Sequence, residues 1–199
     1  MLAGTKMFVD SNISPAQAIR ANPAQGYCPK HVLSQQCLLT VHYWGFDAQL
    51  HRGQIVVHQD VTTDIHDFFE LAEHIRFPFA GVVPLAHPDY LWDRDKTVLQ
   101  GNLTYGFNWR TVHGATVLSR HAQGLAIDVN PLQNPYQAAG DGAHVLWPPT
   151  RYNPLAPGSL RVDSPLVVLM ESRGWAWGGN QYGTSGGGAT DYMHFEKRR

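Results

Sequence analysis

The sequence predicts an α+β fold with an antiparallel sheet. The chain has 199 residues, which is the usual size of a single domain. Most of its apolar runs are short and strand-like, and they are separated by turn residues. Only two longer stretches have clear helical signals, and no internal repeat or low-complexity run is visible. Together these observations favour the α+β class.

The first 37 residues contain one short helix signal, in which Ser14 is the expected N-cap and Pro15 occupies the first helical position. A loop rich in proline and glycine follows. We expect residues 1–37 to form a packed N-terminal extension and residues 38–199 to form the main domain. Residues 38–44 and 54–58 are apolar or β-branched runs, separated by Gly45, Asp47 and Gly53. They predict an antiparallel hairpin with a rather long loop.

A helix is predicted after Asp60, which is a plausible cap. The apolar residues that follow recur at helical spacing: Val61, Ile65, Phe68, Phe69, Ala72 and Ile75. Pro78 is expected to end this helix. Residues 81–85 then predict a buried strand, and residues 86–118 are expected to be mostly loop.

In residues 124–130 apolar and other side chains alternate, which predicts a half-buried strand that ends at Pro131, with Asp128 facing away from the packed side. Residues 131–163 contain six prolines and predict a long ordered loop that covers or shapes a site. Ser164, Pro165 and Gly174 bracket a second helix over residues 166–170.

Residues 175–188 are expected to form a loop rich in glycine and tryptophan, in which Trp175 and Trp177 serve packing and not sugar binding. Residues 192–196 predict a closing strand with Met193 and Phe195 on one face and His194 and Glu196 on the other.

Composition excludes several partners. The net charge is −1, and no stretch interleaves several basic residues with aromatic ones, so nucleic acid and anionic membranes are not expected partners. No apolar run approaches the ~20 residues of a membrane span, and residues 1–20 lack the apolar region of a signal peptide. A chain of this length needs no metal merely to fold, so we expect any metal site to be catalytic.

Two of the eleven histidines stand in unusual company, because each is paired with a nearby carboxylate in a distinctive motif: His121, seven residues before Asp128, and His194, three residues after Asp191. A hydrolytic zinc site takes three protein ligands and keeps a fourth position for water, so two histidines and one aspartate suffice. Gly124 would let the chain turn between His121 and Asp128. Spacing alone also allows hydrogen-bonded core histidines without any metal.

The motifs resemble a known family. Ser-x-His-x-x-Gly-x-Ala-x-Asp at residues 119–128, with Asp-x-x-His at residues 191–194, resembles the zinc D-alanyl-D-alanine carboxypeptidases, a group that includes vancomycin-resistance carboxypeptidases and phage L-alanyl-D-glutamate endolysins. Residues 107–110, 128–136 and 174–179 extend the resemblance, which covers roughly residues 38–197. It implies a compact domain whose central antiparallel sheet carries the zinc site, with helices on one side.

By this resemblance His121, Asp128 and His194 bind one zinc ion. Asp191 is the acid/base for the attacking water, at a position where many relatives have glutamate. A turn or bulge must bring Asp191 and His194 together, since residues i and i+3 of an ideal strand point to opposite faces, and glycines 186–188 make this plausible.

Arg110 matches the family's active-site arginine, which suits a substrate carboxylate or an oxyanion. Ser119 and Tyr192 are expected to flank the bound peptide, although a serine near a turn is as often a backbone cap. Arg120 stands where relatives often have asparagine, and its role is open. Glu196 is either a partner of a ligand histidine or a solvated charge. His113 and His144 are given no role.

The expected function is zinc-dependent hydrolysis of an amide bond in peptidoglycan stem peptides, with removal of terminal D-alanine slightly favoured. The alternatives are an L-alanyl-D-glutamate endopeptidase, an amidase for another D-amino-acid substrate, and a zinc-retaining binding module, against which an intact Asp191 argues. A periplasmic or secreted location is expected, with the cytoplasm as the alternative, and the oligomeric state is not predicted.

Cys28 and Cys37 enclose a short loop, and we expect a disulfide between them, which would imply an oxidising compartment. With His31 they would also allow a metal cluster, for which a fourth ligand is not evident. Free thiols are the third alternative.

Overall fold

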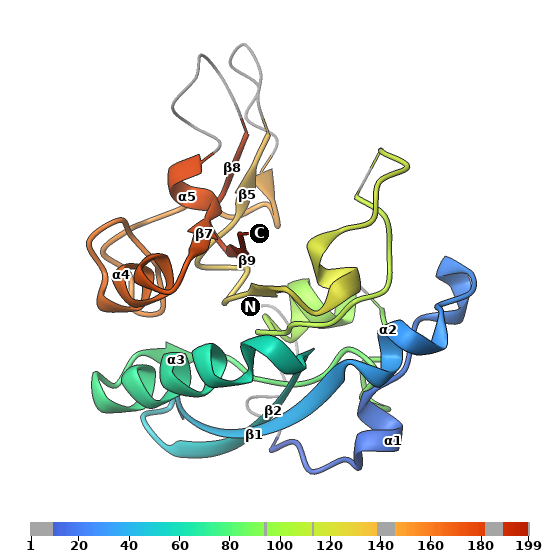
Figure 1. Cartoon of the computed structure of the whole chain (residues 1–199). Coiled ribbons are helices and arrows are strands. Elements are labelled where there is room, and N and C mark those ends of the chain that lie inside the picture. The colour runs from blue at the N-terminus through green and yellow to red at the C-terminus, as the bar shows by residue number, and fades with distance from the viewer. Residues whose placement is uncertain (1–9, 94, 113, 139–145, 182–188, 199) are drawn as a thin grey trace.

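The computed structural model describes residues 10–93, 95–112, 114–138, 146–181 and 189–198. Its short helices and small, mostly antiparallel sheets confirm the α+β class (Figure 1). Within the described ranges the strands form three sheets of three strands each, in the orders β2-β1-β3, β4-β9-β7 and β6-β5-β8. The expected central sheet is therefore divided into small sheets, of which the second carries two of the candidate metal ligands.

The first sheet contains the predicted hairpin. Strands β1 (Gln36–Gly45) and β2 (Leu50–His58) are antiparallel, and β3 (Pro78–Phe79) runs parallel to β1. The turn is shorter than predicted, since β2 begins at Leu50 and includes Gly53. A Cβ atom at Gly53 would lie 2.7 Å from Cβ of Val82, so glycine lets the segment around Val82 pack against the strand.

Helix α3 (Thr62–His74) confirms the helix expected after Asp60. Asp60 is not its cap, because this residue lies in a preceding 3-10 turn, η2 (Gln59–Val61), whose N-cap is His58. The helix ends at His74, before Pro78. The predicted apolar face is buried except for Ile75, which is the C-cap and is exposed. Figure 1 shows α3 between the β1–β2 hairpin and helix α4 (Pro165–Ser172).

The strand predicted over residues 81–85 is wrong. The segment is buried, but within it only Val82 forms an isolated bridge, to Thr104, and its carbonyl accepts a hydrogen bond from the backbone N–H of Gln54 at 2.9 Å. Hydrophobicity therefore indicated burial correctly, whereas a regular ladder does not form. The described part of residues 86–118 is mostly loop, as predicted, with one helical segment, η3 (Asp95–Gln100).

The second sheet is formed by β4 (Ala126–Asp128), β7 (Trp175–Trp177) and β9 (His194–Lys197). The half-buried pattern predicted for β4 is wrong, because Ala126, Ile127 and Asp128 are all buried: the apolar face packs in the core and the other face lines the candidate site. The loop predicted from residue 175 is also wrong, since β7 is followed directly by α5 (Gly178–Gln181).

Helix α4 confirms the second predicted helix. It begins at Pro165 after the N-cap Ser164, and Gly174, with φ of +78°, follows its C-terminal end. The side chain of Ser164 makes no capping hydrogen bond.

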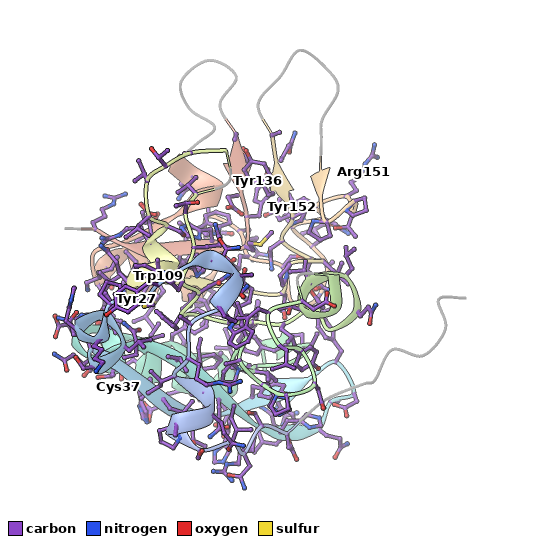
Figure 2. All side chains as sticks on the ribbon, turned by 90° about the vertical axis from the view of Figure 1, so that its right-hand side faces the viewer. Tyr27, Cys37, Trp109, Tyr136, Arg151 and Tyr152 are labelled. Atoms are coloured by element: carbon purple, nitrogen blue, oxygen red, sulfur yellow. The ribbon has the colours of Figure 1, made fainter. Side chains whose placement is uncertain are left out.

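Two short strands interrupt the proline-rich segment 131–163. Strands β5 (Tyr136–Gln137) and β6 (Leu146–Trp147) form the third sheet with β8 (Thr190–Asp191). Figure 2 shows Tyr136 and Tyr152 toward the end of the molecule that carries this sheet. Fully buried Asn134 holds the segment in place: its amide donates to the carbonyls of Val129 and Gly158, each at 3.0 Å, and its Oδ1 accepts from the N–H of Leu160 at 2.7 Å.

The N-terminal segment packs against the domain. It contains α1 (Pro15–Ala18), which confirms Ser14 as N-cap, and then η1 (Pro23–Gln25) and α2 (Lys30–Ser34). The described residues 10–37 share an apolar cluster with the rest of the chain, and β1 already begins at Gln36; the domain boundary at residue 37 stays a prediction. The buried members of this cluster are Ala18, Cys28, Val56, Phe107, Trp109 and Ala122.

The predicted disulfide is wrong, because Cys28 and Cys37 are both free thiols. Cys28 packs into the apolar cluster just described, whereas Cys37 lies in β1 opposite Val57. With His31 the two cysteines also form none of the metal-type clusters found among the described residues.

The main core joins the first two sheets and helices α3 and α4. Trp175 and Trp177 are at most 2% exposed and belong to this core, which confirms their packing role. Phe68 makes edge-to-face contacts with Phe79 and Phe195, so α3 connects the hairpin with the C-terminal strand β9. Within the described ranges no helix is both long and apolar enough to cross a membrane.

Candidate metal centre

Three potential ligand atoms converge in a buried position. Nε2 of His121 lies 3.2 Å from Oδ1 of Asp128 and 3.2 Å from Nδ1 of His194, and the last two atoms are 3.1 Å apart. These residues form a group that could hold a metal ion. A tetrahedral ion with ligands at 2.0–2.1 Å separates them by about 3.3–3.4 Å, so the observed triangle is close to the required size.

His121 is delivered by a short 3-10 helix, η4 (Arg120–Gln123). Ser119 is its N-cap, and Gly124 closes it in the left-handed conformation with φ of +69°, which confirms the turn expected there. A side chain at Gly124 would overlap the side chain of Gln36 and lie 2.6 Å from the backbone nitrogen of His58. Glycine therefore satisfies both the backbone conformation and the close packing against β2.

Asp128 and His194 are placed by strand pairing. They are direct partners in the antiparallel register of β4 and β9, so their side chains project from the same face of the sheet. Glu196 follows two residues later on this face, and its carboxylate lies 3.2 Å from Nε2 of His194. The predicted common face of His194 and Glu196 is thus confirmed, and Glu196 is a partner of the candidate ligand.

The hydrogen bonds on the far side of each imidazole determine what the near side can do. Nδ1 of His121 lies 2.7 Å from the carbonyl oxygen of Gly106, and Nε2 of His194 faces the Glu196 carboxylate. Both partners are acceptors, so each imidazole donates outward and, when neutral, turns a lone pair toward Asp128. Two lone pairs and a carboxylate oxygen cannot satisfy one another. The donor set therefore fits a bound cation.

The same crowding appears in the pKa values. Burial alone would raise the pKa of Asp128, but the facing His121 and His194 hold it well below its usual range. Burial lowers the pKa of His121. Burial also opposes the charged form of His194, yet its hydrogen bonds to Asp128 and Glu196 raise its pKa to about 10. Without a metal, a proton on His194 supplies the missing positive charge.

Asp191 stands beside this donor set with a different environment. It ends β8, and a two-residue turn at Tyr192 and Met193 leads to His194, as the predicted bend requires. Glycines 186–188 lie outside the described residues. Oδ1 of Asp191 is buried and has no hydrogen-bond partner in the part of the chain that the structure describes. Burial, with a contribution from the Asp128 charge, raises the pKa of Asp191 to about 7, which is the range of a general base.

Arg110 lies close enough to affect the charges of the site. Its positive charge acts to lower the pKa values of both His121 and Asp191. Within the described residues the guanidinium makes no ion pair, and Nη1 donates to the backbone carbonyl of Thr111 at 3.2 Å. Most of its donors are therefore available for a ligand.

Ser119 and Tyr192 have partners within the protein. Oγ of Ser119 accepts a hydrogen bond from the backbone N–H of His121 at 3.3 Å, so it caps η4. The ring of Tyr192 stacks on Tyr152 with centroids 3.6 Å apart. Their contact with a substrate stays a prediction.

Arg120 is occupied as well. It donates to Gln123 at 2.8 Å and to the backbone carbonyl of Lys197, and thereby joins η4 to the end of β9. This gives the residue a structural role that the sequence left open. His113 and His144 lie outside the described residues.

Tyr105 and Gly106 contribute to the site but were not identified from the sequence. The carbonyl of Gly106 orients His121, and the buried ring of Tyr105 lies 5.5 Å from the His121 ring, centroid to centroid. A Cβ at Gly106 would overlap the carbonyl oxygen of Val56, so only glycine fits there. The available signal was a glycine directly before the Phe107–Arg110 motif.

A second group of potential ligands occurs on α3, formed by His66, Asp67 and Glu70. His66 and Glu70 are exposed and pair with each other at 3.3 Å, whereas Asp67 is engaged by Arg173. An exposed pair of this kind is common without a metal, in contrast to the buried group.

A buried His-Asp-His donor set beside an isolated carboxylate and an arginine is the type of site found in metal-dependent hydrolases. Residues 113–197 match a family model described as D-alanyl-D-alanine carboxypeptidase. The match confirms the resemblance over this segment and supports a peptidase. It includes all three donors and Asp191, whereas Tyr105, Gly106 and Arg110 precede it. Searches of curated proteins and of solved structures found no match to the chain.

Proposed function

We propose that the protein is a zinc-dependent peptidase that removes the terminal D-alanine from peptidoglycan stem peptides. The observation that carries this proposal is the convergence of three potential ligand atoms, from His121, Asp128 and His194, next to Asp191, whose Oδ1 has no partner among the described residues. The match to the carboxypeptidase family supports the substrate class.

His121, Asp128 and His194 would hold the zinc ion through Nε2, Oδ1 and Nδ1. When bound there, zinc polarises the scissile carbonyl and lowers the pKa of a bound water to roughly 7. Gly106 and Glu196 keep the two imidazoles in the required tautomers by accepting their outward protons.

Asp191 is the proposed general base and acid. Its raised pKa, about 7, matches the water that it has to deprotonate, and its unpartnered oxygen is free to accept the proton. The same carboxyl then returns this proton to the amine that leaves. Aspartate is one methylene shorter than the glutamate of many relatives, and the tight turn to His194 brings it near the donor set.

Arg110 is the proposed recognition group for the chain end. A guanidinium binds a carboxylate through two parallel hydrogen bonds, and the free donors of Arg110 would select a substrate with a terminal carboxylate. This favours removal of terminal D-alanine over cleavage between L-alanine and D-glutamate. The wall substrate lies outside the cytoplasmic membrane, so the proposal includes an extracytoplasmic location.

The test offers the zinc-loaded protein a pentapeptide stem that ends in D-alanyl-D-alanine and, separately, a tetrapeptide stem, with mass spectrometry of the products. We expect loss of one alanine from the pentapeptide alone. The Asp191→Asn variant is the matched control and should leave both stems intact.

Two results would overturn the proposal in different ways. Release of the L-alanine end from both stems would assign the protein as an L-alanyl-D-glutamate endopeptidase. No cleavage of either stem by zinc-loaded protein would favour a binding module instead.

A further inference from the structure

The segment before Arg110, at Tyr105 and Gly106, lies next to the candidate metal centre. Tyr105 and Asp128 are opposite each other in an isolated antiparallel bridge and exchange both backbone hydrogen bonds, at 3.1 and 2.9 Å. In such a pair the two side chains project to the same side and lie close together. The phenol of Tyr105 is therefore directed to the same region as the Asp128 carboxylate.

The phenol is enclosed between the ligand residues. Tyr105 is 7% exposed, and its ring is tilted by 36° against the ring of His121. Burial, together with the nearby charge of Asp128, raises the pKa of Tyr105 well above its usual range. Tyr105 therefore lies against two of the three candidate ligands: its ring packs against His121, and its backbone pairs with Asp128.

A carboxylate needs such a donor to keep one orientation. Ionised Asp128 only accepts hydrogen bonds, and rotation about its terminal torsion would exchange or misalign its two oxygens. His121 and His194 both approach the same oxygen, Oδ1. When a metal is bound, both imidazoles are neutral and offer no proton to this oxygen, so these two residues do not fix the carboxylate by hydrogen bonds.

We propose that Tyr105 is a positioning residue of the metal centre, whose hydroxyl donates to Asp128 and holds Oδ1 toward His121 and His194. This inference rests on the proposed zinc site but not on the proposed substrate. It extends the centre beyond the segment that matches the carboxypeptidase family, because Tyr105 precedes residue 113.

The neighbouring backbone gives this residue a rigid base. The N–H of Thr104 donates to the carbonyl of Gly81 at 2.8 Å, and that of Phe107 donates to the carbonyl of Val56, in β2, at 2.7 Å. The backbone of Tyr105 is thus held on both sides, and burial of the ring against His121 restricts the side chain.

The experiment compares the zinc dissociation constants of the wild type, Tyr105→Phe and Tyr43→Phe by competition with a chelator. Tyr43 is a fully buried tyrosine of β1 in the main core, so its variant is the matched control for removing a buried phenol hydroxyl. We expect Tyr105→Phe to bind zinc about 10–100-fold more weakly, the usual effect of losing a partner of a metal ligand. Tyr43→Phe should bind zinc as the wild type does.

The phenylalanine of Tyr105→Phe keeps the aromatic ring against His121. Thermal unfolding of the two zinc-free variants checks that both of them fold.

The second measurement is the visible absorption spectrum of the Co²⁺-loaded proteins. A spectrum that changes in Tyr105→Phe alone would report altered metal coordination, which the loss of a merely structural residue would not cause.

Zinc affinities of the wild type and Tyr105→Phe that agree within twofold, or an equal loss in both tyrosine variants, would overturn the inference. Wild-type protein that binds zinc but cleaves no stem peptide would refute the proposed substrate alone. Wild-type protein that binds no zinc would refute both proposals.

Discussion

Replacement of Gly106 by alanine should weaken the metal centre without altering any ligand. The added Cβ would overlap the carbonyl oxygen of Val56 and lie 3.0 Å from Cγ1 of Val57, so the backbone at residue 106 has to move away from β2 by about 1 Å to restore normal contacts. The carbonyl of Gly106 is now 2.7 Å from Nδ1 of His121. A shift of that size takes this bond beyond the ~3.2 Å limit of good geometry.

The expected magnitude has two parts. Overpacking costs about 1–3 kcal/mol of folding free energy. Loss of the partner that orients a metal ligand typically lowers metal affinity by about 10–100-fold, which corresponds to about 1.4–2.7 kcal/mol. The two parts are separable, since the first is measured by unfolding of the zinc-free protein and the second by chelator competition.

Gly45→Ala is the matched control. Its Cβ would overlap Oδ1 of Asp47, a side chain that can move, and neither residue belongs to the candidate metal centre. We expect it to lose stability but to keep the wild-type zinc affinity. If Gly106→Ala also keeps that affinity, the Gly106 carbonyl does not orient His121 and the reasoning is refuted.

Three further predictions concern the ligands, the base and the C-terminal strand. Elemental analysis should find almost no zinc in purified His121→Ala. The control His66→Ala, in the exposed group on α3, should keep about one ion per chain; one tightly held ion in His121→Ala would contradict the ligand assignment. Asp191→Asn should keep zinc and fold but lose at least ~10²-fold in turnover. Wild-type activity should fall as the pH drops below about 7, because the base must be ionised; retained turnover in Asp191→Asn would refute its role as the base. Asp64 accepts hydrogen bonds from Lys197 at 2.7 Å, Trp175 at 2.8 Å and Arg173 at 3.2 Å. Asp64→Asn should therefore lower the free energy of unfolding at pH 7 by about 2 kcal/mol, which corresponds to about 4–8 °C in Tm. Burial alone would raise the pKa of Asp64, but these partners lower it. The stabilisation by Asp64 is therefore present above the ordinary pKa near 4 and is lost as the pH falls through the lowered value. A Tm difference that does not shrink below about pH 4, or an equal effect of Asp60→Asn at an exposed site, would contradict this prediction.

The sequence predicted those parts of the fold that have a periodic or capping signal. Helix α3 follows from apolar residues at helical spacing, and α4 follows from Ser164, Pro165 and Gly174. The β1–β2 hairpin follows from two apolar runs with turn residues between them. Each of these signals lies within the element that it predicts, so the prediction does not depend on contacts with distant parts of the chain.

The wrong predictions concern segments whose structure is decided by distant contacts. Strand β7 is a run of three buried residues without any period, and only its pairing with β9 makes it a strand. The alternation in β4 predicted one exposed face, but that face lines the candidate site and is buried there. The sequence separation of Cys28 and Cys37 likewise says nothing about where their side chains point.

For the candidate site, the motifs predicted which side chains converge but not what orients them. His121, Asp128, His194 and Asp191 stand in recognisable patterns, whereas Tyr105 and Gly106 act through a bridge to Asp128 and a backbone carbonyl. A carbonyl acceptor carries no signal of residue type, because every residue has one. Such partners become visible only in three dimensions.

The convergence of ligands from distant parts of the chain links metal loading to folding. His194 is separated from Asp128 by 66 positions and from His121 by 73, so an unfolded chain does not present the three donors together. Zinc would then bind the native state selectively and stabilise it by mass action, by about 4 kcal/mol at a free concentration of 1,000 times the dissociation constant. Metal supply would thus set the resistance of the protein to proteolysis as well as its activity.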